Sequence, residues 1–269
     1  MVGIIQSMQE SYLTKLETVL LIISLKKKPE KSQKEMSMEY VCSQRRWEYA
    51  CDISRTIEQL KLTVILMENL PTTDVLQKYE KNQEELILYY QGVLFDLVHQ
   101  LKNKIFQLVN LLTQKDTVMN PKKEHDVSLS DLIKKKGEVI GKIGIKDLLE
   151  AWSEDESLKG PIGVVLQKRS IHHHRVSSLH YNFLFQKIKF LRTLDSNFQE
   201  MLSDYGKKEV GRLIPVEFEK YKEDVLQKMR NTMSEIQTNI EKVAESLLVY
   251  FQFPTSLEEI KKLSLSCLE

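Results

Sequence analysis

The chain has 269 residues, of which 42% are hydrophobic and 29% are charged, a composition that is typical of a folded globular protein and excludes a largely disordered one. Its formal net charge of +1 excludes a strongly basic or acidic protein, so composition alone identifies no nucleic-acid or membrane partner. Only 9 glycines and 6 prolines interrupt a sequence rich in good helix formers. These features predict an all-α protein made of few, long helices.

The N-terminal part predicts an amphipathic helix over residues 8–27. Its apolar run, 19–25, is far shorter than the roughly 20 residues that span a bilayer, and the basic residues follow it, unlike those of a signal peptide. The chain has three cysteines, an odd number without metal-like spacing, which fits a reducing compartment. We therefore expect a cytoplasmic protein with no membrane contact.

Two long helices follow in the predicted order. The first begins near the N-cap Ser37 and continues to Asn69, where Pro71 ends it. Its apolar residues recur every three or four positions: Ile53, Ile57, Leu60, Val64 and Met67. The second extends from Asp74 to about Leu112 with the same spacing, a length of roughly 55–60 Å. Residues 115–127 lose the pattern and predict a loop.

The middle of the chain is interrupted by glycine. The positions are Gly137, Gly141, Gly144, Gly160 and Gly163. This segment predicts short helices near 129–136, 145–153 and 161–169. A long helix is expected over 176–205, and another begins after Pro215, which suits a first helical turn, and stops at Pro254.

Four long helices with apolar faces must bury those faces against one another, which predicts a bundle of long antiparallel helices with shorter helices inserted in the middle. We divide the chain into an N-terminal helix and linker over 1–36, the helical bundle over 37–253, and a C-terminal tail over 254–269. Within this tail, residues 257–265 are expected to form a short helix.

One polar cluster stands out between the glycine-rich segment and the next long helix. Residues 169–175 read Arg-Ser-Ile-His-His-His-Arg, and His180 follows. Four of the 6 histidines therefore fall within nine residues. Because histidine titrates near neutral pH, such a cluster at a helix entrance is a candidate site for a ligand or a reaction.

The cluster resembles the motif of the HEPN superfamily, whose members are helical-bundle nucleases. Arg169 and His174 have its Arg-x4-His spacing, and Arg175 and His180 repeat that spacing. The family often carries a small polar residue directly after the arginine. Ser170 meets this loosely, although Asn, Asp or His is usual there, so we prefer the first pair. The resemblance implies an all-α bundle with the motif at a junction between core helices.

The function that the resemblance implies is a metal-independent endoribonuclease of toxin or defence type, a hydrolase that needs no cofactor. Cleaving RNA without a metal requires an acid and a base, and an arginine fork can stabilise the charge that develops on phosphorus. We assign the acid/base role to His174 and phosphate stabilisation to Arg169. The expected substrate-binding residues are Ser170, His173, Arg175 and His180. HEPN nucleases usually pair two motifs, so the expected partners are RNA, a second copy in a homodimer, and an antitoxin or another protein.

Other interpretations of the same residues stay open. His172 and His173 could simply face solvent in a turn, and His172, His174 and a carboxylate could hold zinc. Arg169 and Arg175 could instead pair with the acidic residues 154–156.

The alternative function is a non-catalytic protein–protein interaction or scaffold role, for which we expect an exposed apolar patch away from the cluster.

Gly137 to Lys142 is not a phosphate loop, because it is one residue short and no Ser or Thr follows the lysine. Glu48 and Asp52 are candidates for an acidic helper residue on another helix.

Overall fold

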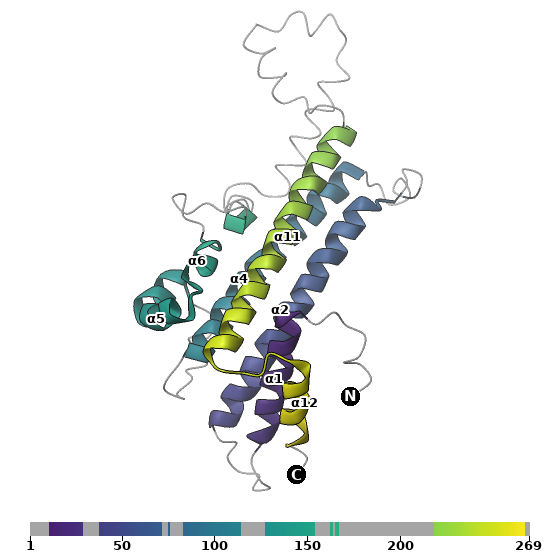
Figure 1. Cartoon of the computed structure of the whole chain (residues 1–269). Helices are drawn as coiled ribbons and strands as arrows, with labels where there is room; N and C mark the ends of the chain where they lie inside the picture. The colour runs from purple at the N-terminus through teal and green to yellow at the C-terminus, as the bar shows by residue number, and fades with distance from the viewer. Residues whose placement is uncertain are drawn as a thin grey trace, which may run out of the picture.

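The computed structural model describes residues 11–28, 38–71, 75, 83–113, 127–153, 162–163, 165–166 and 218–266. The labelled elements of these residues are all helices (Figure 1): α1 Tyr12–Lys26, α2 Met38–Glu68, α4 Gln83–Thr113, α5 Leu129–Ile143, α6 Lys146–Glu150, α11 Phe218–Tyr250 and α12 Leu257–Leu265. The predicted all-α fold class is confirmed. No helix of the described ranges is long and apolar enough to cross a membrane.

The long helices α2 and α4 form an antiparallel pair. At one end of the pair, Arg46 Nε donates a hydrogen bond to the Leu111 carbonyl at 3.2 Å. At the other end, Gln83 Nε2 donates to the Pro71 carbonyl at 3.0 Å. Residues early in α2 therefore meet residues late in α4, as the prediction of antiparallel helices requires.

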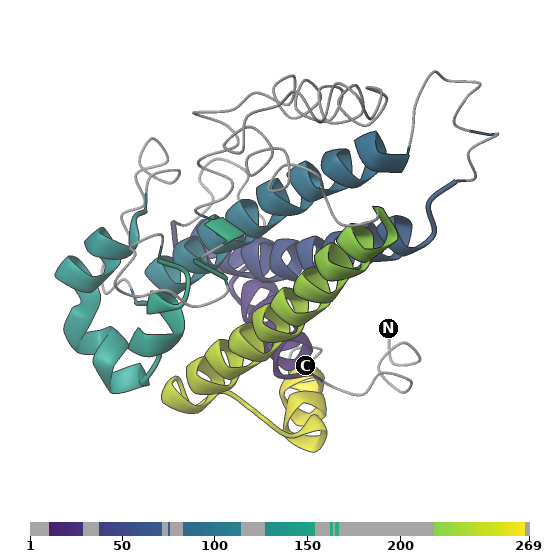
Figure 2. The ribbon, with the colours of Figure 1, turned by 90° about the horizontal axis from the view of Figure 1, so that it is seen from above.

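Helix α11 runs alongside α2, with α5 and α6 on one side of the bundle and α1 and α12 at its lower end (Figures 1 and 2). Near the C-terminus of α2, Arg230 Nη2 lies 2.8 Å from Glu68 Oε1. Helix α1 packs against both α2 and α11, and Lys27 just after it forms an ion pair with Glu39 at the start of α2. In the sequence, the short helices α5 and α6 lie between the long helices α4 and α11, as predicted.

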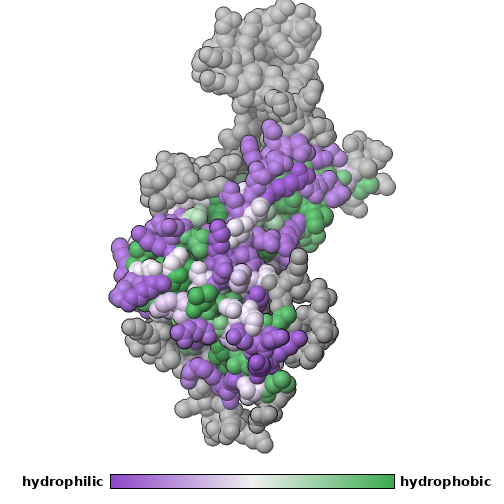
Figure 3. Space-filling model, viewed as in Figure 1, coloured by the Kyte–Doolittle hydropathy of each residue, from purple (hydrophilic) through white to green (hydrophobic). Residues whose placement is uncertain are grey.

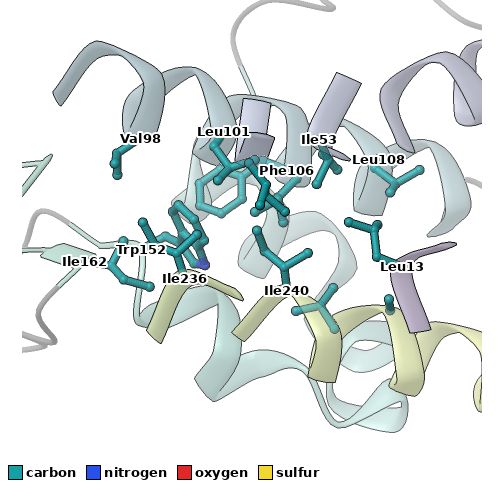
Figure 4. Close-up of a cluster of buried hydrophobic side chains, with 14 of the residues drawn as sticks. Leu13, Ile53, Val98, Leu101, Phe106, Leu108, Trp152, Ile162, Ile236 and Ile240 are labelled. Carbon is teal, nitrogen blue, oxygen red and sulfur yellow. The ribbon is translucent and has the colours of Figure 1, made fainter. Parts of the chain in front are cut away.

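A single apolar core connects all seven labelled helices, and Figure 4 shows a part of it with side chains from α1, α2, α4 and α11. The predicted α2 stripe, Ile53 to Met67, is buried at each of its five positions. Among the described residues, the largest fully buried side chain is Trp152, just after α6. Burial of these apolar side chains is the main favourable contribution to the stability of the bundle.

Helix α5 is longer than the sequence pattern indicates. We expected it to end at 136, but it continues through Gly137 and Gly141 to Ile143. It ends where Gly144 adopts a left-handed conformation, with φ of 78°. A glycine inside a helix costs only about 1 kcal/mol relative to alanine, and the burial of Ile140 and Ile143 in the last turn offsets that cost.

The two C-terminal helices end and begin as their sequences favour. Helix α11 stops four residues before Pro254, where Gln252 adopts a positive φ of 53°. Helix α12 has a capping box: Ser256 Oγ accepts from the Glu259 N–H at 3.3 Å, and the Glu259 carboxylate accepts from the Ser256 N–H. It packs on α1, where Lys26 Nζ donates to Ser266 Oγ at 3.0 Å. The predicted helix over 257–265 is confirmed.

Several predictions fall wholly or largely on residues that the structure does not describe. They are the N-cap Ser37, the loop over 115–127, of which only Val127 is described, the helix over 176–205 and Pro215. Of the expected helix that starts at 74, Val75 is helical and α4 itself begins at Gln83. Of the expected helix over 161–169, the described residues 162–163 and 165–166 are helical.

Candidate functional site

The candidate residues of the polar cluster lie outside the described part of the chain. They are Arg169, Ser170, His173, His174, Arg175 and His180, all within residues 167–217. The acidic residues 154–156 and His172, which belong to the other interpretations of the cluster, lie outside it as well. The structure does describe the elements that precede and follow the cluster, which are the residues around Leu166 and helix α11.

The chain that leads to the cluster is anchored in the core. Ile162, Val165 and Leu166 are buried, and Leu166 comes three residues before Arg169. Gly163 makes this approach possible, because a Cβ atom at its position would lie 2.4 Å from the Ser153 carbonyl oxygen. Only glycine fits this contact without a shift of the backbone.

A buried polar contact fixes the same region to α11. Trp152 Nε1 donates a hydrogen bond to Asn239 Oδ1 at 2.8 Å, and Asn239 Nδ2 donates to the Leu148 carbonyl at 2.9 Å. Figure 4 shows the indole beside Ile162 and Ile236. Because one amide satisfies both a side chain and a backbone carbonyl, α6 is held at a defined position along α11.

A second group of titratable side chains lies where α1, α2 and α11 meet. Glu17 of α1 accepts a hydrogen bond from the Ser54 hydroxyl of α2. Glu241 of α11 accepts from the backbone N–H of Leu13, at 3.3 Å, in the first turn of α1. The Cys51 thiol of α2 lies close enough to Glu17 for the charge of that carboxylate to raise the pKa of the thiol. We call Glu17, Glu241, Cys51 and Ser54 the α1 acidic cluster.

The electrostatics of this cluster favour a protonated Glu17. Burial, and then the negative charge of Glu241, raise the pKa of Glu17 to about 7. Burial, followed by the charge of Glu17, raises the pKa of the Cys51 thiol to about 11. The thiol is therefore neutral at physiological pH and a weak nucleophile, so the cluster is suited to holding a proton and not to covalent catalysis.

At the edge of the cluster, Tyr12 of α1 contacts α11. A hydrogen bond to Glu245, followed by the charge of that carboxylate, raises the pKa of Tyr12. Lys15 Nζ lies 4.7 Å from the centroid of the Tyr12 ring. Three carboxylates, Glu17, Glu241 and Glu245, thus line the contact between α1 and its neighbours.

The proposed acidic helpers on α2 have local partners. Glu48 accepts hydrogen bonds from Gln44, at 2.8 Å, and from Arg45, at 3.0 Å. Asp52 accepts from Arg55 at 3.1 Å. Within the described ranges, no three His, Cys, Asp or Glu side chains are placed to hold a metal ion.

Glu17 is a residue that the sequence interpretation missed, although its position carried a signal. It falls four residues after Leu13 and three before Leu20, which are both buried, so it occupies the apolar stripe of its helix. A carboxylate in such a stripe indicates an acid that is at least partly buried. Comparison of the chain with protein-family models, with curated proteins and with solved structures finds no match.

Proposed function

We propose that the chain is a HEPN-like protein that binds and cleaves RNA, a metal-independent endoribonuclease of toxin or defence type. The observation that carries the proposal is the Arg169-x4-His174 spacing in a chain whose described elements are all helices. Two features support it: the motif falls between α6 and α11 in the chain, and a buried segment ending at Leu166 precedes it. Cys42 and Cys51 are not joined in disulfide bonds, which supports a reducing, cytoplasmic location.

The proposed reaction uses a general base and a general acid. His174 takes the proton of the ribose 2′-hydroxyl, the 2′-oxygen attacks the adjacent phosphorus, and the bond from phosphorus to the 5′-oxygen breaks. The leaving 5′-oxygen receives a proton from an acid. In a homodimer, this acid is the motif histidine of the second copy of the chain. Arg169 stabilises the charge on the phosphorane through paired hydrogen bonds. The products carry a 2′,3′-cyclic phosphate and a 5′-hydroxyl.

The test is an RNA-cleavage assay with a chelator present. We expect Arg169→Ala and His174→Ala each to lower the cleavage rate by about 100-fold or more, as is typical when a transition-state stabiliser or a general acid or base is removed. The matched control is His125→Ala, which changes a histidine outside the cluster and should cleave like wild type. Substitution of Ser170, His173, Arg175 or His180 should weaken RNA binding. Equal cleavage by wild type and His174→Ala, or none by either at high enzyme concentration, would overturn the proposal.

A second candidate function is supported by an exposed apolar patch on α2. Leu62, Ile65 and Leu66 are 54%, 52% and 40% exposed. Their spacing of three and four residues puts them on one face of the helix. Figure 3 shows hydrophobic residues at the surface next to the upper part of α11, where α2 lies in Figure 1. Such a patch could receive the apolar face of a partner's amphipathic helix, which would make the chain an interaction or scaffold protein.

The two candidates are separated by a variant that alters only this patch. Leu62→Glu with Ile65→Glu replaces exposed side chains and leaves the core intact. The interaction function predicts that this variant loses binding to a helical partner, whereas Gln59→Glu, an exposed position on the same helix, retains it. The nuclease function predicts that both variants cleave RNA at the wild-type rate. Unchanged partner binding by the double variant would remove the second candidate.

A further inference from the structure

Helix α1 is held to the bundle by an apolar face and by the α1 acidic cluster. The apolar face buries Leu13, Leu16, Val19 and Leu20 against α2 and α11. Such burial is non-directional and does not depend on pH. Any response of this contact to pH must therefore come from the titratable groups at its border.

The two carboxylates of the cluster have different partners. Glu241 accepts the N–H of Leu13, in a helix turn whose N–H groups lack partners within the helix and whose dipole favours negative charge. Glu17 meets the Ser54 hydroxyl, which can donate to a carboxylate or accept from a protonated carboxyl. The Ser54 contact therefore permits a proton on Glu17, whereas Glu241 acts as an acceptor for the first turn of α1.

Helices α2, α11 and α12 pack against α1, and the titratable and charged groups near Glu17 come from α2 and α11. Helix α11 contributes Glu241, whose charge acts on Glu17, and Glu245, which bonds Tyr12. Helix α2 contributes the neutral Cys51 thiol and, around that thiol, three charged side chains: Glu48, Asp52 and Arg55. Helix α12 meets the far end of α1, where Ser266, just after α12, accepts a hydrogen bond from Lys26. Its charged residues are Glu258, Glu259, Lys261 and Lys262, and none of these is among the described groups that shift the pKa of Glu17.

We propose that Glu17 is a proton-dependent latch for α1: when it is protonated, α1 docks on α2 and α11, and when it ionises beside Glu241, α1 loosens from the bundle. The pKa of Glu17 is about 7 in the docked state, above the ordinary value of 4.5. A carboxyl whose pKa is raised in the folded state stabilises that state. Its contribution to the free energy of unfolding is full when the pH is below the ordinary pKa, and it is lost as the pH rises to the raised pKa. The latch therefore weakens as pH rises towards neutrality.

Loosening of α1 has a structural consequence beyond the helix itself. Leu16 and Val19 are buried in the docked state, and they would become accessible together with the parts of α2 and α11 that they cover. Helix α12, which packs on α1, would lose that support. A modest change in pH near neutrality would thus uncover an apolar surface, which is a means of regulating association.

The test is hydrogen exchange of the full chain, followed by mass spectrometry of the α1 peptide and corrected for the pH dependence of intrinsic exchange. For wild type we expect the opening constant of α1 to rise several-fold, up to about tenfold, between about pH 6 and pH 8. Glu17→Gln, which removes the charge but can still bond Ser54, should abolish that rise. Glu241→Gln should move the rise to lower pH.

The matched control is Glu235→Gln, which neutralises an exposed carboxylate of α11, and it should respond like wild type. Protection of α1 that does not change with pH in wild type would overturn the proposal. So would a Glu17→Gln variant that keeps the full response, or a control variant that loses it.

Discussion

The Asn239 side-chain amide bridges the Trp152 indole and the backbone of α6. It accepts a hydrogen bond from Trp152 Nε1 at 2.8 Å and donates one to the Leu148 carbonyl at 2.9 Å. Both Trp152 and Asn239 are buried, so no solvent replaces a lost partner. The bridge joins residues that are 87 positions apart in the sequence and fixes the inserted short helices on α11.

Replacement of this amide should therefore be costly. Asn239→Ala leaves the buried indole N–H and the partly buried Leu148 carbonyl without their partner, and we expect it to lower the free energy of unfolding by about 2–3 kcal/mol. Gln237→Ala, at an exposed position on the same helix, should change it by less than about 0.5 kcal/mol. Urea denaturation of both variants measures the difference. Equal midpoints for the two would show that the bridge does not stabilise the fold.

Two glycines provide a matched pair with opposite expected effects. A Cβ at Gly163 would meet the Ser153 carbonyl at 2.4 Å, whereas one at Gly141 would meet nothing within 4 Å. Gly163→Ala should lower the free energy of unfolding by about 1–3 kcal/mol. Gly141→Ala, inside α5, should raise it by about 0.5–1 kcal/mol, because alanine favours the helix. Thermal unfolding of both variants gives the signs, and a stabilised Gly163→Ala would contradict the contact.

The periodic parts of the fold could be predicted from the sequence. Helices α2, α11 and α12 follow regular apolar spacing, and prolines or capping residues limit them, so local chemistry identifies them. The end of α5 was predicted wrongly. Gly137 and Gly141 are poor helix residues, but the burial of Ile140 and Ile143 outweighs their propensity, and that burial depends on tertiary packing.

The two polar sites differ in what the sequence could indicate. The spacing of Arg169 and His174 is local, so the motif could be recognised, but its function stays a prediction. Glu241 lies close enough for its charge to act on Glu17 although the two are far apart in the chain, and no local pattern predicts this proximity. The sequence shows a carboxylate within an apolar stripe. Only the fold shows that a second carboxylate lies near it.

The C-terminus of α11 offers a simple route to a more stable protein. The helix ends in a Schellman motif, in which the Phe253 N–H bonds the Leu248 carbonyl at 2.9 Å and the Gln252 N–H bonds the Val249 carbonyl at 3.1 Å. Gln252 must adopt a left-handed φ of 53° there, which costs a residue with a Cβ roughly 1 kcal/mol. Gln252→Gly should raise the melting temperature by a few degrees, about what 1 kcal/mol produces at this size. An unchanged or lower melting temperature would contradict the strain.

The raised pKa of Glu17 also predicts how global stability depends on pH. Because the folded pKa is about 7 and the ordinary value is 4.5, the folded state binds more protons than the unfolded state between those values. The free energy of unfolding should therefore fall as pH rises through this window and should be level above it as far as this group is concerned. Glu17→Leu removes the acid, and at about pH 8 we expect it to stabilise the chain by about 1 kcal/mol, a value reduced for the solvent that reaches this half-buried carboxyl. Urea midpoints across the pH range, compared with those of Glu235→Gln, measure the effect. A wild-type protein whose midpoint rises with pH in this window, by more than its Glu17→Leu variant does, would show that Glu17 is ionised in the folded state and that its neighbours favour the charge.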